Sequence, residues 1–453
     1  MAIASDNTLS MLKTTYDEDL ANFAPGRLLL RHVIEQAYAL HPGKRIEFCT
    51  DADADLLAWA TSHRRIEHWS FFRGPLPQAL YDLGRMLQNM GRLGASASNG
   101  NPPTVDIHHS VDHLPADALE LLRAQELDSL QLGADWLRNL ERTVFPSHDG
   151  LRYFVLRDKG AALVVMPTVA EPSRLGTRVR SLANFYTALH SPAMQPWVKP
   201  QTLVPLLRSI FKHHAPVRSL RLDPMDPDSV AFKTLSEALR IAGIGTFAYF
   251  CFGNWALSPA GGWKAYLATR SANLRSSVKR MTNRLIQAGG RLEVVTQMAD
   301  LERGLAAYHR VYSSSWKVPE PFGDFMPNLF RLCAARGAMR LGIAWLHDVP
   351  IAAQIWIVLN GRAEIFKVAY DEAYKQYSPG TVVTALLMEH VLELDRVKEV
   401  DYLIGDDAYK SQWMSHRRER WGLVAYNPLS IAGLVGFTRE AAGRAVKRVI
   451  GRP

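Results

Sequence analysis

The sequence contains an internal repeat, and this repeat constrains the fold more than any other feature. Residues 16–40 read YDEDLANFAPGRLLLRHVIEQAYAL, and residues 370–394 read YDEAYKQYSPGTVVTALLMEHVLEL. The same register continues without a gap to Trp59 and Trp413. Because the register holds through segments of helix, strand and loop character, we infer that the two copies share a common origin. Both copies are therefore expected to adopt the same local fold.

The N-terminal copy is incomplete. It begins at Met1, at a point that lies inside a strand hairpin of the C-terminal copy, so residues 1–75 correspond only to about 355–427. Either the missing half is encoded upstream, or the half-unit remains as a docking piece. A half sheet leaves an unpaired strand edge, which folded proteins usually cover. We therefore expect residues 1–75 to dock on the main body or to mediate self-association.

The rest of the chain divides into four further segments. Residues 76–105 combine a short helical pattern with a run rich in Gly, Ser, Asn and Pro, which predicts a short helix and a flexible linker. Helix and strand patterns alternate through 106–260 and again through 261–427, where one long basic helix is predicted over 263–288. Residues 428–453 form a basic amphipathic tail. We expect an α/β (α+β) fold with two tandem units whose mixed central sheets are flanked by helices, plus the half-unit.

The charge, the cysteine content and the lack of long apolar segments limit which partners, metal sites and cell compartments are expected. The formal net charge of +9 favours an anionic partner, such as a nucleotide-like co-substrate, an anionic membrane surface or nucleic acid. The tail could contact anionic lipid weakly, although packing on its own domain is the favoured expectation. The three cysteines form no C-x-x-C pair, so neither a metal site nor a disulfide framework is expected. No secretory signal or apolar span of membrane length occurs, which predicts a cytoplasmic protein, at most peripheral to the inner membrane.

The segment Tyr-Ser-Pro-Gly-Thr at 377–381 follows a predicted strand and opens a predicted helix. Ser378 suits a helix cap, Pro379 suits the first helical position, and Gly380 lets a ligand approach the backbone closely. The free amides of such a helix start, up to Thr381, are suited to a pyrophosphate. From these residues alone, a well-capped helix without a ligand is the favoured interpretation.

A second cluster begins at Asp406, after a predicted strand. Asp406, or its neighbour Asp407, could accept a proton from an attacking amine. Tyr409 could return a proton to the leaving group, and Lys410 could pair with an anionic group of either substrate. The alternative interpretation is that the acids cap a helix and Lys410 is solvated.

The repeat helps to weigh this second cluster. The N-terminal copy keeps the tryptophan, but it has Asp55 and Leu56 at the positions of Tyr409 and Lys410. What only the C-terminal copy contains is expected to be functional rather than structural, which favours Ser378, Tyr409 and Lys410. Asp407 has a counterpart in Asp53 and is therefore less expected to be catalytic, as is Trp413.

Taken together, the motifs resemble the bacterial double-GNAT acyltransferases, relatives of the CelD-like polysaccharide-biosynthesis proteins and, more distantly, of the Fem peptidoglycan aminoacyltransferases. The resemblance extends over about 106–426. It rests on W-x-x-Y-L at 263–267, L-R at 274–275, His309 with Trp316, A-Y-D at 369–371, Y-S-P-G-T at 377–381 and G-D-x-x-Y-K-x-x-W at 405–413.

The resemblance implies two GNAT-like units, of which the second binds an acyl-coenzyme A with its pyrophosphate at 378–381. It implies that an amine attacks the thioester directly, with no covalent enzyme intermediate. It also implies that His309, Trp316 and Asp371 contact the substrate.

The resulting expectation is an N-acyltransferase that moves an acyl group, with acetyl expected, from acyl-coenzyme A to an amine of a small molecule, an amino sugar or a cell-envelope precursor. Two alternatives stay open. A Fem-like enzyme would take its acyl group from aminoacyl-tRNA, whose backbone could meet the basic residues of 264–284; otherwise nucleic acid is not an expected partner. A non-catalytic scaffold in envelope polysaccharide assembly would keep the fold without donor binding.

Overall fold

The computed structural model describes residues 2–4, 7–11, 23–40, 43, 45–49, 54–64, 81, 103–147, 149–212 and 217–450. It separates into two compact units, Met1–Phe72 and Arg73–Pro453. The helix and linker expected within 76–105 lie outside the described residues, apart from Tyr81 and the last three positions.

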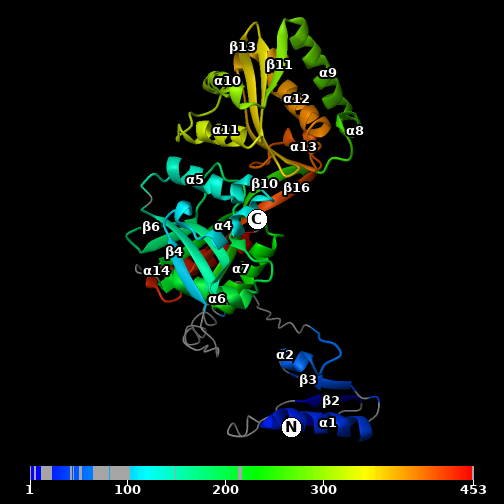
Figure 1. Ribbon diagram of the computed structural model, residues 1–453, viewed down its shortest axis with the longest axis vertical. Coiled ribbons are helices and arrows are strands. Elements are labelled where there is room, and N and C mark those ends of the chain that lie inside the picture. The colour runs from blue at the N-terminus through cyan, green and yellow to red at the C-terminus, as the bar shows by residue number, and fades with distance from the viewer. Residues whose placement is uncertain are drawn as a thin grey trace. The chain divides into compact units, whose positions relative to one another are not determined.

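The first unit is a small three-stranded sheet with two helices, coloured blue in Figure 1. Its strands are paired in the order β1-β2-β3, with β1 antiparallel and β3 parallel to β2. The elements are β1 (Ala2–Ala4), β2 (Thr8–Met11), α1 (Pro25–Leu40), β3 (Arg45–Phe48) and α2 (Ala54–Leu57).

The same arrangement recurs in the second unit, as the sequence repeat predicts. There β13 is antiparallel to β14, α12 follows, and β15 returns parallel to β14. The strand registers agree at the repeat positions: Ala2 pairs with Met11 as Trp356 pairs with Ile365. Each helix also begins after a residue with a left-handed backbone, Ala24 in one copy (φ 48°) and Ser378 in the other (φ 46°).

In the second unit, thirteen strands of the described chain form one large mixed sheet (Figure 1). Its order is β11-β12-β13-β14-β15-β10-β16-β9-β7-β6-β5-β4, with β8 beside β6. The bounds are β4 (Thr104–His108), β5 (Leu151–Asp158), β6 (Ala161–Glu171), β7 (Thr177–Ser181), β8 (Ala193–Met194), β9 (Val217–Met225), β10 (Gly245–Leu257), β11 (Gly290–Val295), β12 (Met339–Leu346), β13 (Val349–Leu359), β14 (Arg362–Tyr370), β15 (Glu399–Asp401) and β16 (His416–Tyr426). Parallel pairing occurs between β14 and β15 and between β7 and β9.

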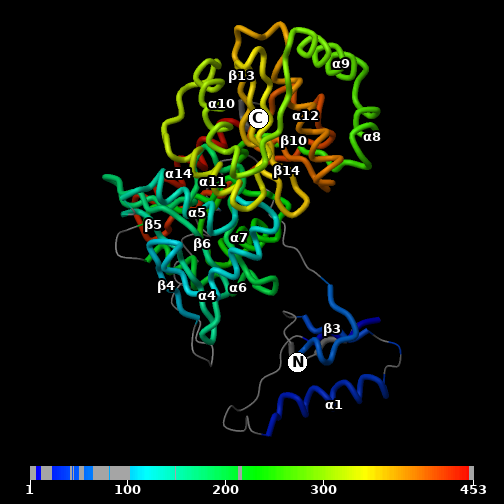
Figure 2. Tube along the Cα trace, turned by 45° about the horizontal axis from the view of Figure 1, so that its top comes forward, coloured from blue at the N-terminus to red at the C-terminus, as the bar shows by residue number. Residues whose placement is uncertain are grey.

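Two long strands join the halves of this sheet. β10 pairs with β15, and β16 pairs with both β10 and β9, so each half contributes a strand to the other. Figure 1 shows β10 and β16 where the two halves meet, and Figure 2 shows β10 beside α12 and β14 of the second half. The boundary predicted near residue 260 therefore falls between segments that share one continuous sheet.

Helices cover both faces of the sheet. They are α4 (Ala116–Glu126), α5 (Ala134–Thr143), α6 (Pro200–Lys212), α7 (Val230–Ile241), α8 (Trp263–Ala268), α9 (Ala272–Gln287), α10 (Leu301–Ser313), α11 (Phe325–Ala335), α12 (Pro379–Glu393), α13 (Lys410–Trp413) and α14 (Ile431–Ile450). In one half, α10 and α11 share a core with Leu341 and Ile343, whereas α9 and α12 pack with Ala344 and Trp356 on the opposite face. The expected α/β fold with a mixed sheet flanked by helices is confirmed.

The helix predicted as one element over 263–288 is in fact two. It breaks between α8 and α9, where Ser271 takes a non-helical conformation and accepts a hydrogen bond from the Leu274 amide at 3.2 Å. A serine side chain that caps the second helix competes with a continuous helical backbone at this position.

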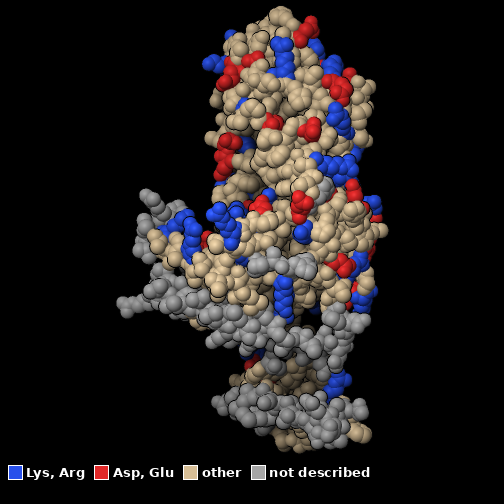
Figure 3. All heavy atoms as spheres, turned by 90° about the vertical axis from the view of Figure 1, so that its left-hand side faces the viewer, with Lys and Arg blue, Asp and Glu red and all other residues tan. Residues whose placement is uncertain are grey.

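The C-terminal tail forms α14, which packs on its own sheet. Phe437 is buried, and its ring stacks on Phe247 with centroids 5.1 Å apart. Within the described part of the chain, no helix has the length and apolar character needed to span a bilayer. On the face drawn in Figure 3, basic and acidic side chains are interspersed over the upper part of the body.

Candidate functional site

The start of α12 lies at a cavity and differs from the expected capped helix. Ser378 precedes the helix in a left-handed conformation (φ 46°, ψ 50°), and its side chain makes no capping hydrogen bond, so the predicted cap is wrong. Pro379 occupies the first turn, as predicted. The main-chain amides of Gly380 and Thr381 donate no hydrogen bond to any residue that the structure describes. Such amides, at the positive end of a helix dipole, favour an anion.

Gln354 holds this first turn in place from beneath. Its side chain is fully buried in β13 and donates hydrogen bonds to the Gly380 carbonyl at 2.9 Å and to Thr384 Oγ1 at 2.8 Å. It accepts a third from Trp356 Nε1 at 3.1 Å. A buried amide with these partners fixes the orientation of the helix start.

The strands β14 and β15 separate beside this helix start. Their pairing ends where Glu364 meets Asp401, although β14 continues to Tyr370. The chain after β15 turns away because the Leu403 amide donates to Asp401 Oδ1 at 2.7 Å, and Leu403 itself is left-handed (φ 53°). Among the residues that the structure describes, the edge of β14 over 365–368 consequently has no neighbouring strand on that side.

A buried ion cluster anchors the point of separation. Asp401 is fully buried and contacts the guanidinium groups of Arg362 and Arg418, the latter at 2.7 Å. Burial alone would raise the pKa of Asp401, but these guanidinium groups hold that pKa below its ordinary value. Asn254 adds hydrogen bonds to Asp401 and to the Leu403 carbonyl. The cluster therefore fixes the direction in which the chain leaves β15.

Tyr409 and Lys410 follow the turn at Gly405. The Tyr409 ring is 47 % exposed and meets Tyr402 edge to face, and burial, with a contribution from Asp407, raises the pKa of Tyr409 to about 12. Lys410 is only 4 % exposed. Its ammonium donates to the Ile404 carbonyl at 2.5 Å and lies 3.3 Å from Asp407 Oδ2. Lys410 thus closes the loop from within, and burial lowers its pKa.

These elements line one cavity of about 770 Å³. It unites most of the residues that the sequence singles out: Ser378, Gly380, Thr381, Trp316, Tyr409 and Lys410. The parted strands contribute 365–368 and 402–404, and α9 contributes Arg280. The positive side chains that line it are Arg280, Lys317, Lys367 and Lys410, and Asp407 supplies the sole carboxylate among the lining residues. The cavity therefore favours an anionic, extended ligand.

Four expected site residues do not line the cavity. His309 is exposed on α10, and Asp371 caps the 3₁₀ helix η6 (Glu372–Tyr377) by accepting from the Ala373 amide at 2.9 Å. Asp406 is held by Arg417 at 2.7 Å and by Trp255 Nε1 at 2.8 Å. Arg417 lowers the pKa of Asp406, which makes it a weaker base. The substrate contacts predicted for His309 and Asp371 and the proton-acceptor role predicted for Asp406 thus gain no support from the cavity. Pro379 is buried in the first turn and also does not line the cavity.

Lys317 is a cavity residue that the sequence reading missed. Burial, together with the nearby Lys367 cation, lowers the pKa of Lys317 to about 8. Lys367 is itself neutralised by Glu320 at 2.9 Å. The only feature of the sequence that could have indicated Lys317 is its position directly after Trp316, a predicted site residue. The exposed ring of Trp316 packs on Tyr370, with ring centroids 4.7 Å apart.

Comparison with known proteins identifies the unit that carries this cavity. The family described as "Acetyltransferase (GNAT) domain" matches residues 1–59 and 272–411. The second range contains the parted strands and the start of α12, and the first corresponds to the incomplete copy of the repeat. Such domains generally take an acyl-coenzyme A as co-substrate. No curated protein matches the chain.

Solved structures with a similar arrangement have low sequence identity. FemX covers 71 % of this chain and 97 % of its own, at 10 % identity and a TM-score of 0.49. The C-terminal domain of a putative lysylphosphatidylglycerol synthetase from Agrobacterium fabrum covers 72 % and 96 %, at 13 % identity and a TM-score of 0.44. A tandem GNAT protein from the clavulanic acid biosynthesis pathway covers 72 % and 99 %, at 11 % and 0.39. With TM-scores below 0.5, these likenesses carry no inference about activity. The family match covers less than half of the chain, and it shows that residues 1–59 and 272–411 are similar to the GNAT acetyltransferase domain.

Proposed function

We propose that this chain transfers an acyl group, in the simplest case acetyl, from acyl-coenzyme A to an amine, and that it belongs to the CelD-like group of double-GNAT proteins. The observation that carries the proposal is the joint presence, in one positively charged cavity, of the unpartnered amides of α12, the free edge of β14 and the Tyr409 hydroxyl.

In this proposal, the diphosphate and the pantetheine arm of the donor each bind to a different group of the cavity. Its diphosphate would accept hydrogen bonds from the amides of Gly380 and Thr381 and contact Arg280. Its pantetheine arm carries two amide groups, which can pair with the free edge of β14 over 365–368 as a further strand would. This places the thioester toward the far end of the cavity, near Lys317 and Tyr409.

The reaction requires two proton movements. The amine attacks the thioester carbon, a C–N bond forms, the C–S bond breaks, one proton leaves nitrogen and one reaches sulfur. Asp407, which replaces Asp406 as the carboxylate at the cavity, can accept the first. Tyr409, with its pKa near 12, remains protonated at neutral pH and can donate a hydrogen bond to the departing thiolate.

Lys317 is a better source of the transferred proton than Tyr409, because its pKa is closer to that of a thiol. A thiol has an ordinary pKa of about 8.5, and the pKa of Lys317 is about 8, so proton transfer from its ammonium to the thiolate is nearly thermoneutral. Transfer from Tyr409 would be uphill by comparison. We therefore assign Lys317 as proton donor and Tyr409 as hydrogen-bond donor to sulfur.

The acceptor is proposed to be an amine of a small molecule, an amino sugar or a cell-envelope precursor. Trp316 supports an amine, because its exposed ring at the cavity can bind a cation against its π face. The location is proposed to be cytoplasmic.

Gly380→Glu tests the donor site. It places a carboxylate where the diphosphate would lie, and repulsion should weaken acetyl-coenzyme A binding about ten- to a hundredfold in calorimetry. Gly323→Glu is the matched control, because its side chain enters open space away from the cavity. Equal affinity of the two folded variants would disprove the donor assignment.

A further inference from the structure

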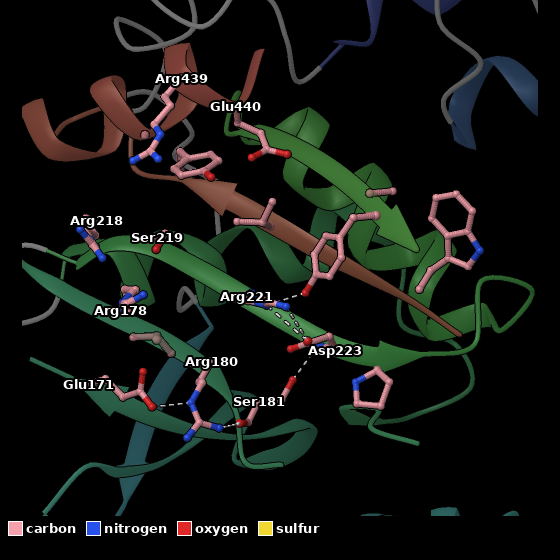
Figure 4. Close-up of a pocket in the computed structure, with 18 of the residues that line it drawn as sticks. Glu171, Arg178, Arg180, Ser181, Arg218, Ser219, Arg221, Asp223, Arg439 and Glu440 are labelled. Carbon is pink, nitrogen blue, oxygen red and sulfur yellow. Dashed lines mark hydrogen bonds and ion pairs between the residues drawn. The ribbon is translucent and has the colours of Figure 1, made fainter. Parts of the chain in front are cut away.

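A second, larger cavity lies in the other half of the sheet (Figure 4). It measures about 1680 Å³ and shares no lining residue with the cavity at α12. Its floor is one face of β7, β9, β16 and β10, and α14 forms a wall. The proposed acyl transfer makes no use of this cavity.

Strand register places arginines side by side on the floor. In the parallel pair β7·β9, Arg178 lies beside Ser219 and Arg180 beside Arg221. The alternate residues of β9, such as Leu220 and Leu222, face the opposite side, where they pack in the core with α6 and α7. The basic floor is therefore the face of the sheet that the core leaves free.

Small residues on α14 keep the cavity open. The helix is anchored near Phe437, and Gly436 lies against the Tyr426 ring, where an added Cβ would come within 2.6 Å. Two turns later, a Cβ at Gly443 would meet no atom within 4 Å. The space between the later part of α14 and the sheet is thus unfilled by the described side chains.

The carboxylates of the cavity are already neutralised. Glu171 is paired with Arg180 at 2.6 Å, Asp223 with Arg221 at 3.1 Å, and Glu440 with Arg444 at 2.9 Å. Four other cations line the cavity and make no side-chain hydrogen bond or ion pair with any residue that the structure describes: Arg178, Arg218, Arg439 and Lys447. The cavity therefore carries a net charge of +4 that no described group offsets.

These free cations come from different sides of the cavity. Figure 4 shows Arg178 and Arg218 on the sheet and Arg439 on α14, with the cavity between them. Like charges that converge on a recess repel one another, and an anion bound between them removes that repulsion. The planar fork of arginine matches the oxygens of a phosphate group.

We propose that this cavity binds a soluble ligand with at least two phosphate groups, one contacted by Arg178 and Arg218 on the sheet and one by Arg439 on α14. We commit to a soluble ligand because Arg178 and Arg218 on the sheet lie across the cavity from Arg439 on α14 (Figure 4). The aromatic groups of Tyr249, Phe250 and Trp421 at the same cavity provide apolar surface for the remainder of the ligand.

Inorganic pyrophosphate is the probe for this site. Calorimetry on the full chain at low ionic strength should detect binding, with a Kd below about 1 mM, that weakens as salt is added. The double variant Arg178→Gln/Arg439→Gln should bind at least about tenfold more weakly. The control Arg174→Gln/Arg310→Gln removes the same charge from two exposed arginines that line neither cavity, and it should bind within about twofold of the wild type.

Three results would overturn the proposal. They are no binding of pyrophosphate by the wild-type chain, an equal loss in the two double variants, and binding only to phosphatidylglycerol vesicles with no binding of soluble pyrophosphate. The last outcome would assign the same cations to a lipid surface. The proposed donor site at Gly380 and Thr381 also accepts a diphosphate, so the assignment to this cavity depends on the loss in Arg178→Gln/Arg439→Gln, which changes no residue of the donor site. Binding of acetyl-coenzyme A by that variant tests the proposed function separately.

Discussion

Replacing Tyr409 by phenylalanine removes one hydroxyl group from the cavity and leaves the ring. The ring keeps its edge-to-face contact with Tyr402, at 5.8 Å between centroids, and the hydroxyl makes no hydrogen bond to a described residue. The free energy of unfolding should therefore change by no more than about 0.5 kcal/mol. Loss of a group that stabilises the departing thiolate should lower kcat about ten- to a thousandfold, or about 1 to 4 kcal/mol of barrier.

The assay follows release of the coenzyme A thiol, with the amine that the wild-type protein uses fastest. Tyr374→Phe is the matched control, because Tyr374 is a partly buried tyrosine near the helix start that does not line the cavity. The expected loss lies in kcat and not in the affinity for acetyl-coenzyme A, since the hydroxyl is assigned to the transition state. A kcat within twofold of the wild type, with an intact fold, would refute the role of Tyr409.

Three further changes test other parts of the account. Lys317, with its pKa near 8, is charged below that pH and neutral above it. A proton-donor role therefore predicts that kcat falls as pH rises through about 8, and that Lys317→Met abolishes this fall. A kcat that rises through pH 8 would contradict the assignment. Lys410→Met should lower the free energy of unfolding by about 1 to 3 kcal/mol in urea titration, because it removes the ammonium that binds the Ile404 carbonyl; unchanged stability would show that this contact does not hold the loop. Deletion of residues 1–72, which form a separate compact unit, should leave the rest of the chain folded, with a thermal midpoint shifted by less than about 3 °C. A deletion variant that is wholly unfolded would show that the half-unit belongs to the core.

Local structure was the part that the sequence predicted well. The repeat fixes which residues form strand, helix and turn, and the two copies keep the same pairing of β2 with β3 and of β14 with β15. Both copies also carry a left-handed residue before Pro-Gly, at Ala24 and Ser378. The propensity of serine predicts that the Ser378 side chain caps α12. The left-handed backbone at Ser378 instead leaves that side chain without a capping hydrogen bond.

Contacts between distant segments were the part that could not be predicted. The sequence around Asp406 gives no sign of a partner, yet Trp255 on β10 and Arg417 on β16 bind its carboxylate. The pKa of Lys317 depends on burial, which no local pattern reveals. Gln354 was recognisable in principle, since it is the single polar residue in the apolar run IAAQIWIV of β13.

The free edges of the donor site provide the most direct test of the central claim. The amides of Gly380 and Thr381 have no described partner, and those on the open edge of β14 face the cavity, so all should exchange with deuterium rapidly in the free protein. Hydrogen exchange with and without acetyl-coenzyme A measures whether the donor covers them. The account predicts slower exchange in the segments 365–370 and 378–384 on donor binding. Bound donor with no protection in either segment would contradict it.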